Sequence, residues 1–582
     1  MKKILIPILG ALAVFTACNE DLLEIPQKGV ISTSTFYQTD EDCEAARVAV
    51  YQGFVWNISA HNGVSNYNPN RFVWNLPADD MYAAGEFFGD NDYCAAMNEF
   101  RYDTNSEVIT NAYKNYYYAL YYPNLVIHYF KDGLPNGQGH TAITKRAVAE
   151  SKVIRAYIHM MLAIGWGTPP IVDGLLDPAA MPNNSESQEY VLQWCAKECI
   201  EALADLDERK SPSDAQGSAY VTKGFANSVI GKCYLFLEDW ANAKKYLGDV
   251  ISSGKYALVP GTSYADMFHA EGDGNSEKIF ETNIDRAEVL NAFSFFSKST
   301  FQEANIWFWR TDHFVADPSK VSVNISNGGW GGLGVPQHLV DKFIANDGVD
   351  SYRLKGTIRS IEDIVYNSEY LNPELNALTV DQKKASKDLG IDNRGLYGQS
   401  FYLDVKQAVR KNDLYDKGGF AIRVNNFIVM RYAEVLLMYA EACLQLGDNA
   451  EAKKYINMIQ ERAGSKTVSA TVDMNVLKTE KQLELWLEGN RWPDMVRWGD
   501  FDRAKTAGKD ITHLYDKFTR EPAATDKNVK YFYEGSRFYT VEVNPATERG
   551  YDIGFKAGKH ELFPFPFEVA SKNANLVQNP GW

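Results

Sequence analysis

Two adjacent carboxylates, Asp79 and Asp80, are the nearest that this sequence comes to a general acid–base pair. Hydrolysis of a glycosidic bond needs two carboxylates held about 5–9.5 Å apart around that bond. Adjacent side chains usually point apart, however, and acidic pairs are commonplace. The sequence contains no G-x-S-x-G nucleophile elbow, no H-E-x-x-H motif and no P-loop, and its nine histidines are dispersed. We therefore predict that the chain is not an enzyme, with a glycoside hydrolase as the less favoured alternative.

Aromatic residues are unusually frequent. The chain has 34 Tyr, 30 Phe and 12 Trp, which make up 13% of its 582 residues. Many of these rings must pack in the core. A helical protein does not need so many Tyr and Trp, and these are the residues that stack on sugar rings and anchor interfaces. The composition therefore indicates a binding surface in addition to a core.

The charge balance and the cysteines restrict the partners and cofactors. The formal net charge is −16, which disfavours nucleic acid as a partner. Apart from Cys18, the six cysteines are scattered without C-x-x-C spacing, so we expect buried free thiols. No loop has the spacing of an EF-hand calcium site. We predict no cofactor and no metal site.

The N-terminus has the layout of a secretory signal. Lys2 and Lys3 precede an apolar run from Ile4 to Ala17, which is shorter than the about 20 residues that a membrane-spanning helix needs. Phe15-Thr16-Ala17-Cys18 resembles a bacterial lipoprotein box, in which the cysteine is acylated. The acidic residues that follow resemble the surface-export signal of Bacteroidota lipoproteins. We predict a signal peptide at 1–17, lipidation of Cys18, a tether at 18–35, and an outer-membrane, cell-surface location in which only the lipid contacts the membrane.

Apolar residues recur at three- and four-residue steps over 40–57, 108–251 and 426–500, which predicts helices there. Cys233–Tyr246 and Ala442–Tyr455 both read as an apolar helix, a turn with Asp, and then A-x-A-K-K-Y. This is a degenerate repeat of the tetratricopeptide type, in which small residues allow two helices to pack closely. Residues 58–105 and 255–425 are rich in Gly, Asn and aromatic residues, and long inserts of this kind are usually functional.

Six sequence blocks, in order, resemble the SusD/RagB family of outer-membrane nutrient-binding lipoproteins. They are Ile154–Val172, Glu277–Glu281, Pro336–Arg353, Met430–Ala442, Trp486–Asp500 and Leu562–Trp582. The resemblance implies a mostly α fold, with one SusD-like domain over 36–582 and four tetratricopeptide-like helical pairs as its scaffold. It also implies a partner, a SusC-like TonB-dependent transporter, over which such a lipoprotein acts as a lid.

The charged residues of these blocks are scaffold residues in our interpretation. We predict that they form buried or half-buried ion pairs between helices. The residues concerned are Arg431, Glu434, Arg491, Asp494 and Arg497.

In the family, an aromatic platform built from the early insert and the middle irregular segment holds a glycan. Aromatic rings bury the apolar face of a sugar, and carboxylates, amides and arginine bind its hydroxyls. The candidates in the early insert are Trp74, Asp79, Asp80, Tyr82 and Phe87, and those in the middle segment are Trp307, Trp309, Arg310 and Trp330. Trp330 lies between two glycine pairs, which favours exposure. For each aromatic candidate the alternative is a packed core residue.

The function that we predict is non-catalytic binding of a polysaccharide or oligosaccharide at the cell surface, followed by delivery to the transporter. Two other classes stay open. One is a peptide receptor of the same family, for which a cleft with backbone donors would fit better. The other is a tetratricopeptide scaffold without a small ligand.

Overall fold

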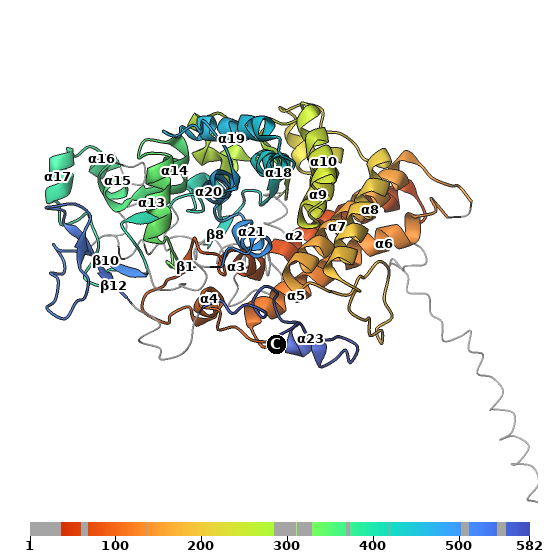
Figure 1. Ribbon diagram of the computed structural model, residues 1–582, viewed down its shortest axis with the longest axis horizontal. Helices are drawn as coiled ribbons and strands as arrows, with labels where there is room; N and C mark the ends of the chain where they lie inside the picture. Colours follow the sequence, from red (N-terminus) through yellow and green to blue (C-terminus); the bar gives the residue numbers. More distant parts are fainter. Residues whose placement is uncertain are drawn as a thin grey trace, which may run out of the picture.

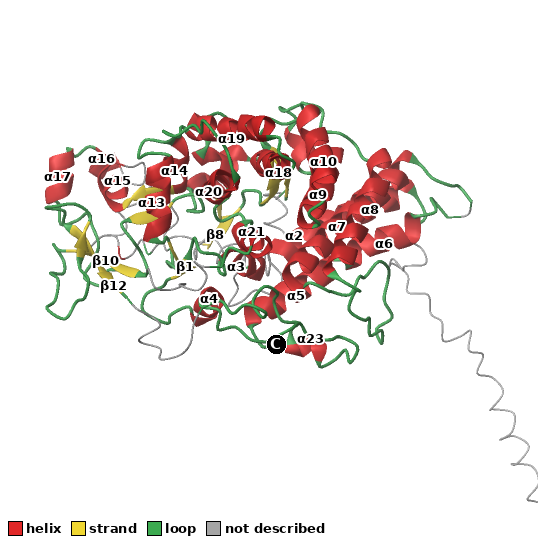
Figure 2. Cartoon of the chain, in the orientation of Figure 1, coloured by secondary structure: helices red, strands yellow, loops and turns green. Residues whose placement is uncertain are grey.

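The computed structural model describes residues 36–59, 68–135, 137–283, 310, 313, 329–367, 373–417, 420–501, 511–543 and 554–582. The predicted signal peptide, Cys18 and the tether lie outside these residues. Helices dominate the described part of the chain, and the strands are short (Figures 1 and 2). The prediction of a mostly α fold is confirmed.

The helices are α2 (Asp40–Ser59), α3 (Pro69–Asn75), α4 (Asp92–Asn98), α5 (Glu107–Ala119), α6 (Tyr121–Phe130), α7 (Ala142–Trp166), α8 (Gln188–Ala202), α9 (Lys223–Phe236), α10 (Trp240–Ser252), α13 (Gln337–Asn346), α14 (Tyr352–Thr357), α15 (Ile361–Asn367), α16 (Pro373–Asn376), α17 (Val380–Ala385), α18 (Tyr432–Gln445), α19 (Asn449–Ala463), α20 (Met474–Glu484), α21 (Arg491–Trp498) and α23 (Phe567–Ala570). Among the described residues, none of the helices is long and apolar enough to span a bilayer.

The strands are β1 (Tyr82–Ala83), β2 (Lys278–Glu281), β3 (Leu333–Gly334), β4 (Ile358–Ser360), β5 (Leu396–Tyr397), β6 (Tyr402–Asp404), β7 (Leu414–Lys417), β8 (Phe420–Arg423), β9 (Ile428–Arg431), β10 (Thr512–Asp516), β11 (Lys530–Tyr531) and β12 (Phe538–Glu542). One sheet has four strands in the order β11-β12-β10-β5. The other pairs, β1-β3, β2-β9, β4-β6 and β7-β8, are antiparallel ribbons.

The scaffold is a continuous series of packed helices. Helices α6 to α10 contact one another in order, α10 packs on α18, and α18 packs on α19 and α20. Figure 1 shows α5–α10 at one end of the molecule with α18–α21 beside them. The Thr141 hydroxyl accepts from the Thr144 amide and thereby caps α7, the longest of these helices. These helices lie in or next to the ranges in which the sequence period predicts helices.

The two repeated segments form equivalent helical pairs, α9–α10 and α18–α19. Asp239 caps α10 and Asp448 caps α19, each through a hydrogen bond from a backbone amide of the first turn. The small residues at the aligned positions, Ala243 and Ala452, are fully buried. This arrangement is compatible with tetratricopeptide-like pairs.

The early insert is more ordered than its sequence pattern indicates, because it contains α3, β1 and α4. Six of the seven residues of α3 are buried, so this helix lacks the polar face that would produce an amphipathic period. The middle segment carries α13–α17 and most of the short strands.

A buried charge network joins the middle segment to the scaffold. Its cations are Arg353, Lys406, Arg431 and Arg462, and its carboxylates are Glu277, Asp347, Glu480, Glu484 and Glu488. Arg431 alone binds Glu277 at 2.7 Å, Glu484 at 2.6 Å and Glu488 at 2.6 Å. Burial raises the pKa of Glu484, but three guanidinium groups outweigh it and lower that pKa to about 2.

The other predicted ion pairs are also present. Glu434 binds Lys232, Arg491 binds Asp79, and Asp494 binds both Arg497 and Lys481. The expectation for the cysteines is confirmed as well, since all six in the described residues are buried free thiols.

We predict that Arg431→Met destabilises the protein by about 3–5 kcal/mol, because it leaves three buried carboxylates short of a cation. Chemical denaturation followed by circular dichroism measures the effect. Lys355→Ala is the control: Lys355 and its partner Asp350 are exposed, so the change should be within about 0.5 kcal/mol. Equal effects of the two substitutions would contradict a structural role of the network.

Candidate functional site

Strands β1 and β3 bring the early insert and the middle segment together. They pair antiparallel, with Tyr82 opposite Gly334 and Ala83 opposite Leu333, and the Ala84 amide extends the ladder by donating to the Gly332 carbonyl at 2.8 Å. Gly334 is required here, because a Cβ atom would lie 2.0 Å from a backbone carbonyl and 2.3 Å from the Tyr82 ring. The ribbon places the segment after Ala84 near the segment before Gly332.

Both segments carry an exposed aromatic side chain. Phe87 is 59% exposed and Trp330 is 40% exposed. A tight turn presents Phe87: the Asp90 carboxylate accepts from the Glu86 amide, and the Asp90 amide donates to the Phe87 carbonyl. Gly331, directly after Trp330, has a φ of +62°, a left-handed conformation that glycine adopts without strain.

Charged side chains gather at the same edge. Arg310 binds one oxygen of Glu86 at 3.2 Å, and Arg394 lies 3.9 Å from the other. Arg394 also binds Asp392 at 2.7 Å. We call the group formed by Glu86, Phe87, Arg310, Trp330 and Arg394 the aromatic edge. It combines exposed apolar rings with charge-assisted hydrogen-bonding groups, the mixture that suits a ligand with apolar faces and a hydroxylated rim.

The structure therefore brings three predicted site residues, Phe87, Arg310 and Trp330, to one part of the surface. Trp307 and Trp309 lie outside the described residues. The remaining four predicted residues, Trp74, Asp79, Asp80 and Tyr82, are buried and make internal contacts.

Trp74 is 5% exposed and belongs to the aromatic core. Its indole nitrogen donates to the Tyr116 hydroxyl at 2.8 Å, and its ring packs edge-on against Trp166 and Phe563. Gly165 makes room for the ring, since a Cβ atom there would lie 2.9 Å from it. Trp74 is thus placed as a core residue, although one side of it borders an interior pocket.

Asp79 and Asp80 are fixed by the α20–α21 region. The Arg491 guanidinium donates to both oxygens of Asp79, at 2.7 and 3.0 Å, and the Trp486 indole donates to the Asp80 carbonyl at 2.8 Å. Burial raises the pKa of Asp79, but Arg491 outweighs it and the net shift is downward. Burial and the Asp79 charge raise the pKa of Asp80 to about 7. The Asp79 carboxylate thus serves an internal contact, and Asp80 is buried with its backbone held by Trp486.

Two residues of the aromatic edge, Glu86 and Arg394, were not predicted as site residues from the sequence. Glu86 adjoins a predicted residue, so its position alone was a usable signal. Arg394 is more than 300 residues away in the chain from Glu86, and no local pattern marks it. Among the described residues, no group of three or more His, Cys, Asp or Glu side chains could hold a metal ion.

This architecture, a helical scaffold with long inserts, is that of SusD-like proteins. The family model of the SusD family, which includes RagB, matches residues 277–582, more than half of the chain. The chain belongs to the SusD family.

Individual relatives agree with this assignment. A SusD-like protein of Bacteroides ovatus is 23% identical over 521 residues, covering 86% of this chain and 83% of the relative. SusD-like protein P25 of Formosa agariphila is 24% identical, with coverages of 83% and 87%.

Solved structures show the same fold. A laminarin binding SusD-like protein has a TM-score of 0.68 at 21% identity, covering 94% of this chain and all of that one. Surface glycan-binding protein A from Bacteroides thetaiotaomicron, solved in complex with laminarihexaose, has a TM-score of 0.66 at 20% identity, with coverages of 93% and 100%.

We predict that Asp80 makes stability depend on pH. The folded state holds the Asp80 proton more tightly than the unfolded chain, so stability should fall as pH rises from 3.8 to about 7, and this contribution should be constant above that. Asp80→Asn cannot ionise and should lose less stability than the wild type over this range. Denaturation midpoints measured across the range check this. The exposed Asp350→Asn is the control and should follow the wild-type profile; an identical profile for Asp80→Asn would contradict the shifted pKa.

Proposed function

We propose that this protein binds a polysaccharide or oligosaccharide at the aromatic edge, without catalysis. The observation that carries the proposal is the pair of exposed rings, Phe87 and Trp330, set beside Arg310, Arg394 and Glu86. Buried surface supplies most of the affinity of such sites, and the charged groups orient the hydroxyls. The names of two structurally similar proteins support the same ligand class. One is a laminarin binding SusD-like protein, and the other is a surface glycan-binding protein solved in complex with laminarihexaose.

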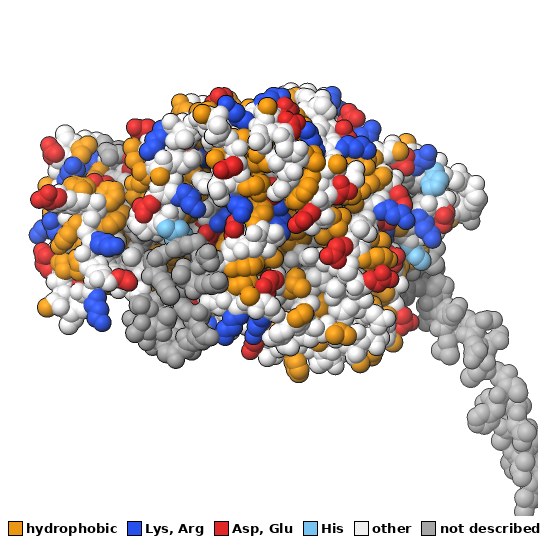
Figure 3. All heavy atoms as spheres, in the orientation of Figure 1, with side chains coloured by type: hydrophobic (Ala, Val, Ile, Leu, Met, Phe, Trp, Pro, Cys, Tyr) orange, Lys and Arg blue, Asp and Glu red, His pale blue; other side chains and the backbone are white. Residues whose placement is uncertain are grey.

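The distribution of charge favours a neutral glycan over a polyanion. On the face drawn in Figure 3, Lys and Arg side chains alternate with Asp and Glu side chains, and neither sign covers a large area. Together with the net charge of −16, this gives a sulfated polymer or nucleic acid little attraction.

The absence of catalysis is part of the proposal. Asp79 and Asp80, the acidic pair that could have served a hydrolase, are buried and held by Arg491 and Trp486. At the aromatic edge, Glu86 and Asp392 are engaged in ion pairs with Arg310 and Arg394.

The proposal includes the cellular setting. The lipoprotein box at Cys18 and membership of the SusD family support an outer-membrane, lipid-anchored protein exposed at the cell surface. They also support delivery of the bound glycan to a SusC-like TonB-dependent transporter. Membrane contact is then through the lipid alone.

We predict that Trp330→Ala and Phe87→Ala each weaken binding of laminarihexaose by about tenfold, because each removes an exposed ring worth more than 1 kcal/mol at a binding surface. Isothermal titration calorimetry on the protein from Asn19 onward measures this. If laminarihexaose does not bind, the same titration is repeated with xylan, mannan and pectic galactan, and the variants are tested with the glycan that binds.

Tyr190→Ala is the matched control. Tyr190 is 45% exposed on α8, far along the chain from the edge, and its loss should leave the dissociation constant unchanged. A heat of binding with casein peptides, and none with any of the glycans, would instead support the peptide-receptor alternative. Glycan binding that survives the double substitution Phe87→Ala with Trp330→Ala would move the site away from the aromatic edge.

A further inference from the structure

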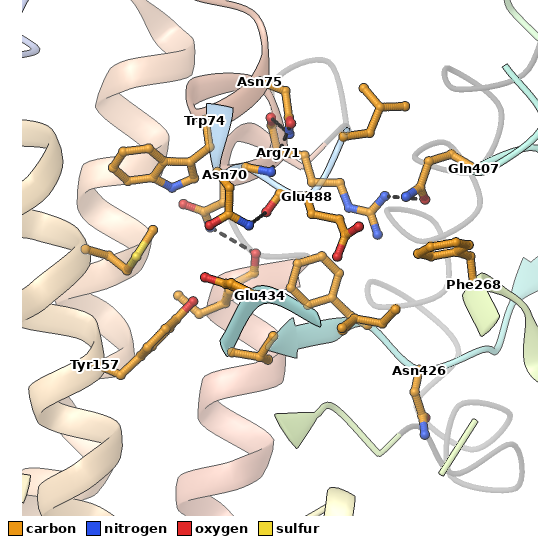
Figure 4. A pocket seen from close by; sticks show the side chains of 18 of the residues that line it. Asn70, Arg71, Trp74, Asn75, Tyr157, Phe268, Gln407, Asn426, Glu434 and Glu488 are labelled. Atoms are coloured by element: carbon orange, nitrogen blue, oxygen red, sulfur yellow. Dashed lines mark hydrogen bonds between the residues drawn. The ribbon is translucent and has the colours of Figure 1, made fainter. Parts of the chain in front are cut away.

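A pocket separate from the aromatic edge lies where α3, α7, β9 and the α20–α21 connection meet; we call it the interior pocket. Figure 4 shows Trp74 and Tyr157 on one side of it and Phe268 and Gln407 on the opposite side. Its volume is about 90 Å³. A cavity needs about 10–15 Å³ to hold a single water, so the interior pocket has room for several waters. A hollow of this size suits a small polar group rather than a chain.

The lining of the interior pocket is rich in amides and aromatic rings. Six side-chain amides border it, from Asn70, Asn75, Gln407, Asn425, Asn426 and Asn490. Five rings border it as well, from Trp74, Tyr116, Tyr157, Phe268 and Phe427. Amides can donate and accept at the same time, as sugar hydroxyls also do, and the rings can cover the apolar face of a sugar.

One of these amides has an unused acceptor. Asn70 is 5% exposed, and its amide nitrogen donates to the Ile58 carbonyl at 2.9 Å, but its Oδ1 atom has no hydrogen-bond partner. A buried acceptor without a partner costs about 1–3 kcal/mol, so such an atom calls for an explanation. A ligand hydroxyl in the pocket would supply the missing donor.

The charged groups of the lining are already engaged. Glu434 binds Lys232 at 2.8 Å, and Glu488 binds Lys406 at 2.7 Å and Arg431 at 2.6 Å. The remaining cation, Arg71, donates to Gln407 Oε1 at 3.0 Å and lies over the Phe427 ring, so a charged ligand would have to displace an existing contact. The pocket therefore favours an uncharged ligand that forms many hydrogen bonds.

Access to the pocket is along β9 and the residues before it. Asn426, Phe427, Ile428 and Val429 are half-buried, so this wall of the pocket reaches the surface. The opposite wall, formed by α3 and α7, is continuous with the core.

We propose that the interior pocket binds one neutral sugar unit, such as a chain end or a side branch. The proposal extends the proposed function to a second site of the same ligand class, built from residues that the aromatic edge does not use. The two sites can therefore fail or succeed separately.

The test is binding of the free neutral hexoses D-glucose, D-galactose and D-mannose at millimolar concentrations, measured by saturation-transfer NMR and calorimetry. Val429→Phe fills the pocket from its outer wall and should abolish the binding. Tyr157→Phe removes only a hydroxyl that borders the pocket and should weaken it about two- to tenfold, the effect of one hydrogen bond. Tyr190→Phe, at an exposed position of α8, is the matched control and should bind hexose as the wild type does.

The double variant Phe87→Ala with Trp330→Ala separates the two sites. The proposal requires that it keeps hexose binding, whereas the weakening of its oligosaccharide binding tests the aromatic edge alone. Failure of all three hexoses to bind the wild type would overturn the proposal. Hexose binding with the wild-type affinity in both Val429→Phe and Tyr157→Phe would also overturn the proposal, whatever the result for oligosaccharides. Thermal midpoints near that of the wild type show that the variants are folded.

Discussion

The rest of the structure depends on the burial of Glu484. Its carboxylate is fully buried and binds three arginines, Arg353, Arg431 and Arg462, each from a different segment of the chain. A buried charge costs several kcal/mol unless good partners surround it, and removal of one partner leaves the others uncompensated. The segments that carry these residues, α14, β9, α19 and α20, can therefore settle only together. This requirement joins the middle segment to the helical scaffold, which apolar packing alone would not do in a unique register.

The residues that follow Glu484 connect this charge network to the aromatic edge. Four residues beyond Glu484, Glu488 binds Arg431 and Lys406. The amide of the next residue, Gly489, donates to the Asn75 side-chain oxygen of α3. Arg491 then holds Asp79, three residues before the start of β1. Thus α3 and β1 are fixed to the scaffold, and β1 in turn positions β3 and the exposed rings beside it. Asp79 and Asp80, which resemble ligand-binding carboxylates in the sequence, belong to this support.

Features that depend on residues close together in the chain could be predicted from the sequence. Helix α7 follows from its apolar period, and the paired state of Arg431 follows from its motif. The sequence did not predict which carboxylate Arg431 meets, because Glu277 lies 154 residues away. Nor did it separate Trp74 from Trp330: both lie in Gly- and Asn-rich segments, but Trp74 meets a space left by Gly165 and is buried. Exposure of a ring is decided by its tertiary neighbours, so only the flanking glycines of Trp330 gave a usable signal.

The two sites that we propose differ in what each can distinguish. An exposed ring recognises the apolar face of a sugar, and many sugars share that face, so the aromatic edge would favour capture of a chain over choice of its units. In the interior pocket a hydroxyl of the wrong orientation leaves an amide unpaired, and an unpaired buried amide costs more than a lost contact at the surface. Discrimination between sugars would then come from the amide-lined pocket near Asn70, and retention of the polymer from Phe87 and Trp330. Since α3 carries Asn70 and its end leads into β1, one rigid support would serve both tasks.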